Sequence, residues 1–170
     1  MKKISVILLM IFACGCAANK IYVDSDEVPG LGAEVSFPAG KIVPIELRRV
    51  LSGNRIELTN GEVVSYIGVY IPQIHEIPCE AKRLNEKLIM ENEIRLEFDT
   101  EQRDSRSRLL AYVYTVEGKF INEEIIKSGF AKALNKPPNL KHEDTFLKAE
   151  DAARMASRGI WSKDLMTQGD

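Results

Sequence analysis

Three arginines at positions 103, 106 and 108 are the residues whose type and spacing most directly suggest chemistry. A guanidinium group holds a phosphate or a carboxylate through paired N–H donors. Arg103, Arg106 and Arg108 are therefore candidates for binding a phosphate or an acidic partner. The same arginines could instead pair on a solvated turn with the acidic residues around them, which are Asp99, Glu101 and Asp104. The sequence leaves both alternatives open.

Four tyrosines offer a second kind of binding surface, because an exposed phenol ring can stack against a nucleic-acid base. They are Tyr66, Tyr70, Tyr112 and Tyr114. Period-two alternation puts Tyr112 and Tyr114 on the same strand face as Leu110, which favours packing for these two. The two histidines are predicted to be structural, His75 at the surface and His142 in capping or packing.

The first residues have the features of an export signal. Met1 to Lys3 is cationic, and residues 4–13 form an apolar run of ten residues. Such a run is too short to span a bilayer as a helix, which takes about 20 residues, but it is typical of a signal peptide. The run leads into Ala13-Cys14-Gly15-Cys16, which resembles the lipobox of bacterial lipoproteins. The expected leader is residues 1–16, with cleavage before Cys14 or Cys16.

This resemblance implies that Cys14 or Cys16 carries lipid and anchors the chain in the bacterial envelope, outside the cytoplasm. Neither cysteine is followed by Asp, which favours the outer membrane where the organism has two membranes. Of the three cysteines, Cys79 alone lies outside the leader. It has no partner for an internal disulfide and no metal-ligand spacing around it, so we expect a partly buried structural thiol.

Length and composition restrict the class of protein. A chain of 170 residues, 45% hydrophobic and 28% charged, fits one ordinary globular domain with a short appendage. Collagen-like, coiled-coil, disordered and polytopic membrane classes are excluded. The chain has 23 Lys and Arg against 25 Asp and Glu, and loses Lys2 and Lys3 with the leader. This mildly acidic balance is not typical of a dedicated polyanion binder, although it leaves room for a local basic groove.

The elements that must position these side chains follow from hydrophobic periodicity. A Gly- and Pro-rich stretch from Ala17 to Pro44 predicts a linker, and Asn60-Gly61 between two apolar runs predicts a hairpin turn. Strands are predicted at Ile45–Leu51, Arg55–Leu58, Val63–Val69, Glu93–Phe98 and Leu110–Tyr114. Helices are predicted at Glu80–Glu91, Asn122–Ser128 with Asn122 as N-cap, and His142–Ser157. This order indicates an α+β fold, mainly β, with a closed five-stranded OB-type barrel and three helices.

Four stretches in the same order resemble the staphylococcal nuclease-like (thermonuclease) family. They are Val64–Pro72, Arg103–Tyr114, Ile121–Ala131 and Gly159–Ser162. The resemblance covers residues 45 to about 163 and implies an OB fold and a calcium-dependent phosphodiesterase. The expected organisation is thus a leader at 1–16, a linker at 17–44, a nuclease-like domain at 45–165 and a tail at 166–170.

The motifs of active family members are altered in this chain. Those members share an Asp-Gly-Asp-Thr turn, an Arg at the start of the third strand, an Asp-Thr-Pro-Glu at its end and an Arg before the fourth strand. Here the turn is Ser52-Gly53-Asn54-Arg55, so the resemblance puts Asn54 at a metal-ligand position. Tyr70 takes the second metal-ligand position, Gln73 the general-base position and Ser65 that of the first arginine. Arg108 is the one retained position.

These substitutions predict a lost calcium site and an inactive enzyme. Two carboxylates are missing and Arg55 is added, a local change of about three charge units, which repels a divalent cation. Gln73 cannot accept a proton near neutral pH. We therefore expect no cofactor and a binding or envelope-associated module, with the oligomeric state unassigned. One alternative is a nuclease with altered ligands, in which Glu76 replaces the base; Glu46, Glu57 and Glu80 are the other carboxylates not far away in sequence. Another is binding of nucleic acid or an anion without cleavage, through Arg103, Arg106 and Arg108.

Overall fold

The structure is a computed structural model that describes residues 42–90 and 93–162. Its strands are β1 (Ile42–Ile45), β2 (Leu47–Ser52), β3 (Arg55–Leu58), β4 (Val63–Tyr66), β5 (Val69–Tyr70), β6 (Ile94–Glu97), β7 (Leu109–Thr115) and β8 (Lys132–Ala133). Its helices are α1 (Ile77–Ile89), α2 (Ile121–Lys127), α3 (Glu143–Met155) and the 3-10 turn η1 (Gly159–Trp161). The predicted leader with Cys14 and Cys16, the linker up to residue 41 and the tail lie outside the described residues.

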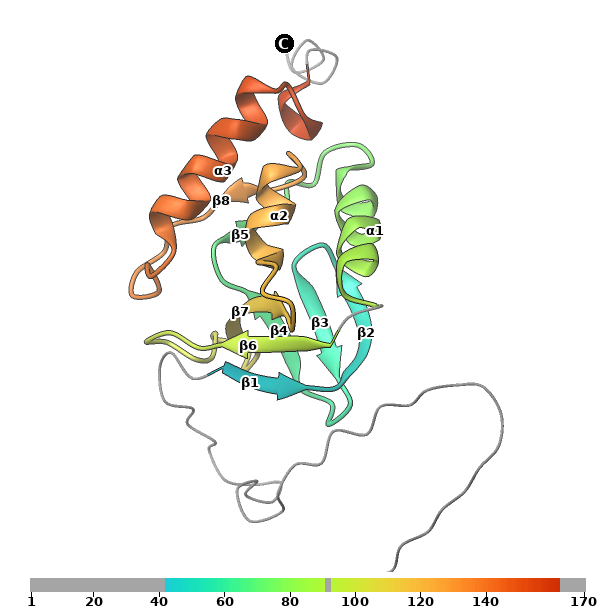
Figure 1. Ribbon diagram of the computed structural model, residues 1–170, viewed down its shortest axis with the longest axis vertical. Helices are drawn as coiled ribbons and strands as arrows, with labels where there is room; N and C mark the ends of the chain where they lie inside the picture. Colours follow the sequence, from blue (N-terminus) through green and yellow to red (C-terminus); the bar gives the residue numbers. More distant parts are fainter. Residues whose placement is uncertain (1–41, 91–92, 163–170) are drawn as a thin grey trace, which may run out of the picture. The chain divides into compact units, whose positions relative to one another are not determined.

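Six strands form one sheet in the order β1-β6-β7-β4-β3-β2 (Figure 1). Neighbouring strands are antiparallel except β4 and β7, which are parallel. The mixed α+β class with three helices and OB-type topology is as predicted, but the barrel is not closed. In the described part of the chain, the edge strands β1 and β2 do not pair with each other.

The barrel is open between β1 and β2 because of the short connection between these two strands. Glu46 is the single residue between β1 and β2, and one residue is too short for a hairpin loop. The chain therefore bends at Glu46, so that β1 pairs with β6 while β2 pairs with β3. The Glu46 carbonyl accepts a hydrogen bond from the Thr59 amide at 3.1 Å. β1 covers residues 42–44 of the predicted linker, where Pro44 is compatible with an edge strand.

The β3–β4 connection is the predicted hairpin. Gly61 has φ +87°, a conformation that glycine adopts without strain. The Asn60 side-chain oxygen accepts a hydrogen bond from the Glu62 amide at 3.0 Å. The strand predicted at Val63–Val69 is broken at Gly68, which has φ +77° and lies against the ring of Phe146. Beyond this turn the chain forms β5, which pairs with β8.

The helices match the predicted three, with shifted ends. α1 begins at Ile77 rather than Glu80, because Pro78 suits the first turn of a helix, where its missing N–H costs nothing. The prediction of Asn122 as the N-cap is wrong, because Phe120 is the N-cap residue of α2. Asn122 is instead fully buried inside the helix, donating to the Ile67 carbonyl at 2.8 Å and accepting from the Val113 amide at 2.9 Å. No helix within the described ranges is long and apolar enough to cross a membrane.

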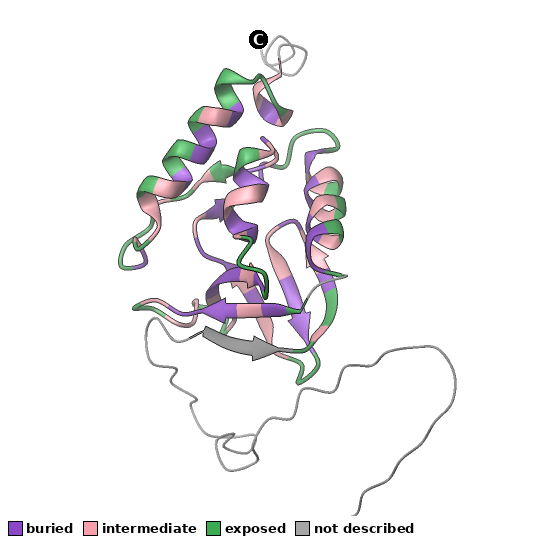
Figure 2. Cartoon of the chain, viewed as in Figure 1, coloured by how far each residue is buried: buried purple, intermediate pink, exposed green. Residues whose placement is uncertain are grey.

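The core lies between the sheet and the inner faces of the helices (Figure 2). α2 lies between α1 and α3 (Figure 1) and also contacts β7 and β5. The largest fully buried side chains are Tyr112, Phe98 and Phe146. α1 packs against β2, which brings the N-terminal part of α1 next to the turn between β2 and β3.

Candidate functional site

The positions assigned from the family resemblance converge on one cavity of about 300 Å³. This cavity, called the site cavity below, lies where the β2–β3 turn, the end of β5 and the start of β7 meet. Its lining residues are Ser52, Gly53, Asn54, Arg55, Ser65, Tyr70, Ile71, Gln73, Pro78 and Arg108. Five residues far apart in sequence are thus brought together, namely Asn54, Ser65, Tyr70, Gln73 and Arg108.

Strand register explains this convergence. β3 and β4 pair with Arg55 opposite Ser65, and the parallel pairing of β4 with β7 sets Ser65 beside Leu110. The Tyr66 amide donates to the Asn54 carbonyl at 3.0 Å, which joins the β2–β3 turn to β4. Arg108 directly precedes β7, so it enters the cavity from the far side of β4.

Asn54 is held in a fixed orientation by two neighbours. Its side-chain nitrogen donates to the Val69 carbonyl at 2.9 Å, and its side-chain oxygen accepts from the Ser52 hydroxyl at 3.0 Å. The amide orientation follows from the partner, because the Val69 carbonyl can only accept. The residue at the first metal-ligand position therefore uses its amide to tie the β2–β3 turn to β5.

Arg55 follows Asn54 and contributes a cation to the site cavity. Its Nε donates to the Ser52 hydroxyl at 3.2 Å, and the residue is half-buried. No carboxylate lies within ion-pair distance of its guanidinium among residues 42–90 and 93–162. A positive charge thus occupies the turn that holds a metal carboxylate in active family members.

Arg108, the retained family position, is paired within its own loop. Its Nη2 lies 2.6 Å and its Nε 2.7 Å from Oδ2 of Asp104. Burial raises the pKa of Asp104, but hydrogen bonds from the Arg108 side chain and from the amides of Arg106 and Arg108 outweigh it and hold that pKa below its ordinary value. The Arg108 charge is therefore largely balanced by Asp104.

The predicted cluster of three arginines does not form a common pocket. Arg103 makes a two-point contact with Glu62, at 3.1 and 2.8 Å, and also donates to the Ser107 carbonyl at 2.7 Å. Arg106 is exposed, and of the three only Arg108 lines the site cavity. Ion pairing on the turn is thus found for Arg108, whereas Arg103 uses a carboxylate from the β3–β4 hairpin that the sequence did not suggest.

The remaining lining side chains are uncharged. Tyr70 is 49% exposed at the end of β5, and Gln73 is exposed with its side-chain nitrogen 3.3 Å from the Ile71 carbonyl. Neither group can bind a divalent cation strongly, and an amide cannot act as a general base.

The four carboxylates that could supply a base in a nuclease with altered ligands lie outside the site cavity. Glu57 is paired with Arg48 and Arg49, Glu80 with Arg83, and Glu46 contacts Thr59. Glu76 is exposed at the start of α1, and none of these four lines the site cavity. In residues 42–90 and 93–162, no three His, Cys, Asp or Glu residues are grouped so that they could hold a metal ion.

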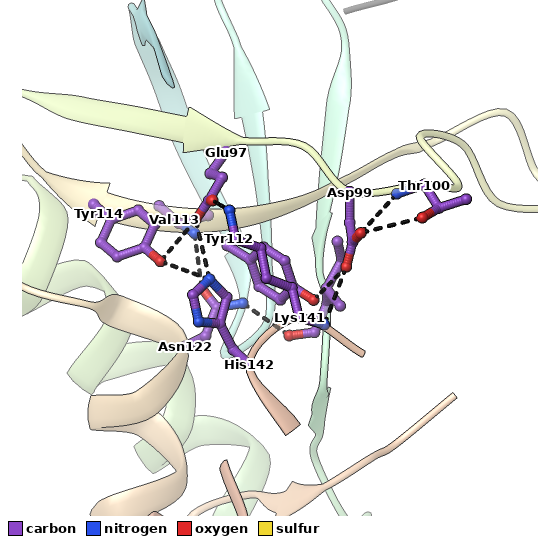
Figure 3. Close-up of polar contacts among 10 residues, drawn as sticks. Glu97, Asp99, Thr100, Tyr112, Val113, Tyr114, Asn122, Lys141 and His142 are labelled. Carbon is purple, nitrogen blue, oxygen red and sulfur yellow. Dashed lines mark hydrogen bonds and ion pairs between the residues drawn. The ribbon is translucent and has the colours of Figure 1, made fainter. Parts of the chain in front are cut away.

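Three of the four tyrosines are occupied by packing or hydrogen bonds. Tyr66 and Tyr112 are buried, at 3% and 0% exposure, and Tyr112 donates to Asp99 at 2.8 Å. Figure 3 shows Tyr114 and His142 directed toward Glu97, with Tyr114 donating to its Oε2 at 2.9 Å. Burial and the nearby carboxylate raise the pKa of Tyr114, so it stays a donor. Tyr70 alone offers a substantially exposed ring.

Three further candidates from the sequence are His75, His142 and Cys79. His75 is exposed, as predicted, and His142 packs its ring against Tyr112 and Phe120. The expectation of a partly buried Cys79 is wrong, because this thiol is exposed. The buried face of α1 consists of Ile77, Ala81, Asn85, Leu88 and Ile89, and position 79 lies off that face.

Residues 64–163 match the family described as staphylococcal nuclease homologue. This chain belongs to that family. The match begins in β4 and includes the stretches that carry Ser65, Tyr70, Gln73 and Arg108. The nuclease-family fold expected from the four sequence stretches is thereby confirmed.

Curated relatives are named as nucleases. The chain is 35% identical over 136 residues to the SPbeta prophage-derived endonuclease YokF of Bacillus subtilis, covering 73% of this chain and 46% of the relative. It is 35% identical over 135 residues to endonuclease YncB of the same organism, covering 72% of this chain and 64% of that relative. A thermonuclease of Staphylococcus intermedius is 29% identical, and the match covers 69% of this chain and 75% of that relative. This nuclease-family chain thus spans less than two thirds of the length of either Bacillus relative.

Two features of the site were missed from the sequence. The hydrogen bond from Asn54 to Val69 joins residues 15 positions apart and depends on how β5 turns after Gly68. The sequence marked Arg55 as a charge that repels a metal ion, but it did not show the hydrogen bond from Arg55 to the Ser52 hydroxyl. The position of Arg55 inside the motif turn was the available signal.

Proposed function

We propose that this nuclease-family domain does not hydrolyse phosphodiesters and acts as a binding module tethered to the bacterial envelope. One observation carries the proposal. The described residues lining the site cavity include two arginines and no carboxylate. A site of this composition supplies neither the anionic oxygens that calcium requires nor a base for water.

The hydrogen bonding of the turn supports the same conclusion. Asn54 directs its nitrogen at the Val69 carbonyl, so a carboxylate in its place would face another acceptor. Arg55 sets a positive charge beside the same turn, where a divalent cation would be repelled. Metal binding here would require both the charge and the hydrogen bonds to change.

A second candidate function is nuclease activity with altered ligands, and the endonuclease names of the Bacillus relatives favour it. Under this alternative, Arg108 would still be needed to hold phosphate, and cleavage would still require a divalent ion. The two candidates therefore differ in a direct assay.

The deciding experiment incubates the full chain, in neutral detergent, with single-stranded DNA, duplex DNA and RNA in calcium across neutral to alkaline pH. The thermonuclease of Staphylococcus intermedius is the positive control. Because loss of a general base alone costs about 10² to 10⁴ in rate, we expect cleavage at least about 10⁴-fold slower than the control. Calcium-dependent cleavage by the wild type, abolished by Arg108→Ala, would overturn the proposal.

A second experiment tests the loss of the metal site with a variant in which the missing functional residues are restored. This variant combines Asn54→Asp, Arg55→Thr, Ser65→Arg, Tyr70→Asp and Gln73→Glu, which restores the two metal carboxylates, the base and the first arginine and removes the added cation. Calcium binding by calorimetry is expected in the folded restored variant and not in the wild type. A wild-type calcium signal equal to that of the restored variant would contradict the loss of the metal site.

The proposed tether is a lipid on Cys14 or Cys16, which would hold the domain outside the cytoplasm, at the outer membrane in an organism with two membranes. Labelling of the expressed chain with a fatty-acid analogue tests it, with Cys14→Ser and Cys16→Ser as variants. We expect one of the two substitutions to abolish label and to release the chain from the membrane fraction. Unchanged membrane attachment in the double variant would rule out this anchor.

A further inference from the structure

We infer that the site cavity binds a phosphate group without a divalent metal, and that the guanidinium of Arg55 supplies the charge. This inference rests on the proposed loss of the metal site and names the ligand chemistry that remains. It concerns a residue that the family motif does not assign to phosphate binding.

Arg55 is the cation in the site that is free to take an anion. Arg103 is engaged by Glu62, and Arg108 is engaged by Asp104. Arg55 has no carboxylate partner in the described part of the chain, and it donates only its Nε, to the neutral Ser52 hydroxyl. The terminal Nη donors of Arg55 are therefore available, and the half-buried side chain is already oriented.

Neutral donors complete the cavity. Ser65 and Tyr70 are among its lining residues, and the hydroxyl of neither makes a hydrogen bond to another of the described residues. Ser65 lies opposite Arg55 in the β3–β4 register, so its hydroxyl belongs to the same short stretch of sheet. Hydroxyls and a guanidinium are the donor types that bind phosphate oxygens.

The charge balance favours a single anionic group. Arg108 and Asp104 largely offset each other, which leaves the positive charge of Arg55 in a cavity of about 300 Å³. The relatives are named as endonucleases, and nucleic acids carry phosphodiester groups, which favours phosphate as the anion. A site with its own fixed cation needs no bridging metal to hold such a group.

The test measures binding to the full chain in neutral detergent by calorimetry, first in EDTA and then, in a separate titration, in calcium without EDTA. The probes are inorganic phosphate, a short single-stranded DNA with a 5′-phosphate, and the same DNA without it. Binding of free phosphate, of a terminal phosphate or of an internal phosphodiester is distinguished by which probes bind. We expect binding in EDTA, weakening as salt rises.

Arg55→Gln should weaken binding by about 10- to 100-fold, the range for a lost hydrogen bond to a charged group. Arg106→Gln, which removes an exposed arginine outside the cavity, should change it by less than about twofold. Arg55→Lys keeps the charge without the planar fork and should lie between wild type and Arg55→Gln. Thermal unfolding of each variant identifies any that fail to fold. If Arg55→Gln fails to fold, binding by Arg55→Lys and Ser65→Ala decides whether the site cavity holds the phosphate.

Three outcomes would overturn the inference. They are no binding of any phosphate probe in EDTA, binding that appears only after calcium is added, or equal weakening by Arg55→Gln and Arg106→Gln. The first leaves the proposed lack of hydrolysis standing. Cleavage of the DNA probe in calcium would instead overturn the proposed function while leaving metal-free phosphate binding intact.

Discussion

The side-chain nitrogen of Asn54 donates a hydrogen bond of 2.9 Å to the backbone carbonyl of Val69. This bond joins the β2–β3 turn to the end of β5, which are two of the segments that form the site cavity. An amide is needed for it, since a carboxylate has no N–H to give. The position that holds a metal ligand in active family members has thus become a structural contact.

Asn54→Asp should destabilise the fold. The new carboxylate would face the Val69 carbonyl, and a buried acceptor without a donor costs about 1–3 kcal/mol. Urea unfolding followed by circular dichroism measures the change. Asn60→Asp is the matched control, because the Asn60 side chain acts as an acceptor for the Glu62 amide and Asp preserves that role. Equal stability of the two variants would show that the Asn54 bond contributes nothing.

Gly53→Ala should push the site turn away from α1. A Cβ on Gly53 would overlap the Cβ of Ala81, and overpacking of this kind costs about 1–3 kcal/mol. Ala81→Gly in the same chain should recover part of the loss, although glycine in a helix itself costs about 1 kcal/mol. A double-mutant cycle from unfolding curves measures the coupling. Strictly additive effects would mean that the two residues do not press on each other.

Tyr66→Phe should weaken the connection between α1 and the site turn. The Tyr66 hydroxyl donates to the Asn85 side-chain oxygen at 2.9 Å, and the Asn85 nitrogen donates to the Ser52 carbonyl at 2.9 Å. Because Asn85 is fully buried, loss of its donor should cost about 1–3 kcal/mol in unfolding free energy. Tyr70→Phe, at a 49% exposed position, is the control and should be near neutral. A neutral Tyr66→Phe would contradict this role.

Glu97 should make the fold sensitive to acid. Burial raises its pKa, but hydrogen bonds from Lys141, His142 and Tyr114 outweigh burial and hold it below the ordinary value of 4.5. The stabilisation is therefore fully present above that value, and it is lost as the pH falls through the lower pKa of the folded state.

Glu97→Gln should lower stability by about 1–3 kcal/mol at pH 7, where the ionised carboxylate accepts these bonds. The difference from wild type should be smaller at pH 3 than at pH 7, because below the ordinary value of 4.5 the unfolded wild-type chain binds a proton at Glu97, which offsets part of the stabilisation. Unfolding curves at both pH values, with the exposed Glu117→Gln as control, measure this. A difference that stays constant with pH would argue against ionisation of Glu97 as the cause.

Features that depend on neighbours in the chain were predictable. Asn60-Gly61 specifies its hairpin through the conformation of Gly61, and the helical spacing of apolar residues predicted α1 and α3 to within a few residues. β5 and β8 were not predicted as a pair, because two-residue strands carry no periodicity and exist only by pairing with each other. Asn122 was predicted as an N-cap but is a buried link, because its partners are Ile67 in the β4–β5 turn and Val113 in β7.

The sequence by itself determined the nuclease-family fold, through motif stretches in a fixed order, and the chemical types present at Asn54, Ser65, Tyr70, Gln73 and Arg108. Only the tertiary structure decided which partner each polar group meets. Arg103 pairs with Glu62, 41 residues away, whereas Arg108 pairs with Asp104, four residues away. The physical reason is that side-chain partners are chosen by strand register and loop geometry, which bring together residues that no local periodicity connects.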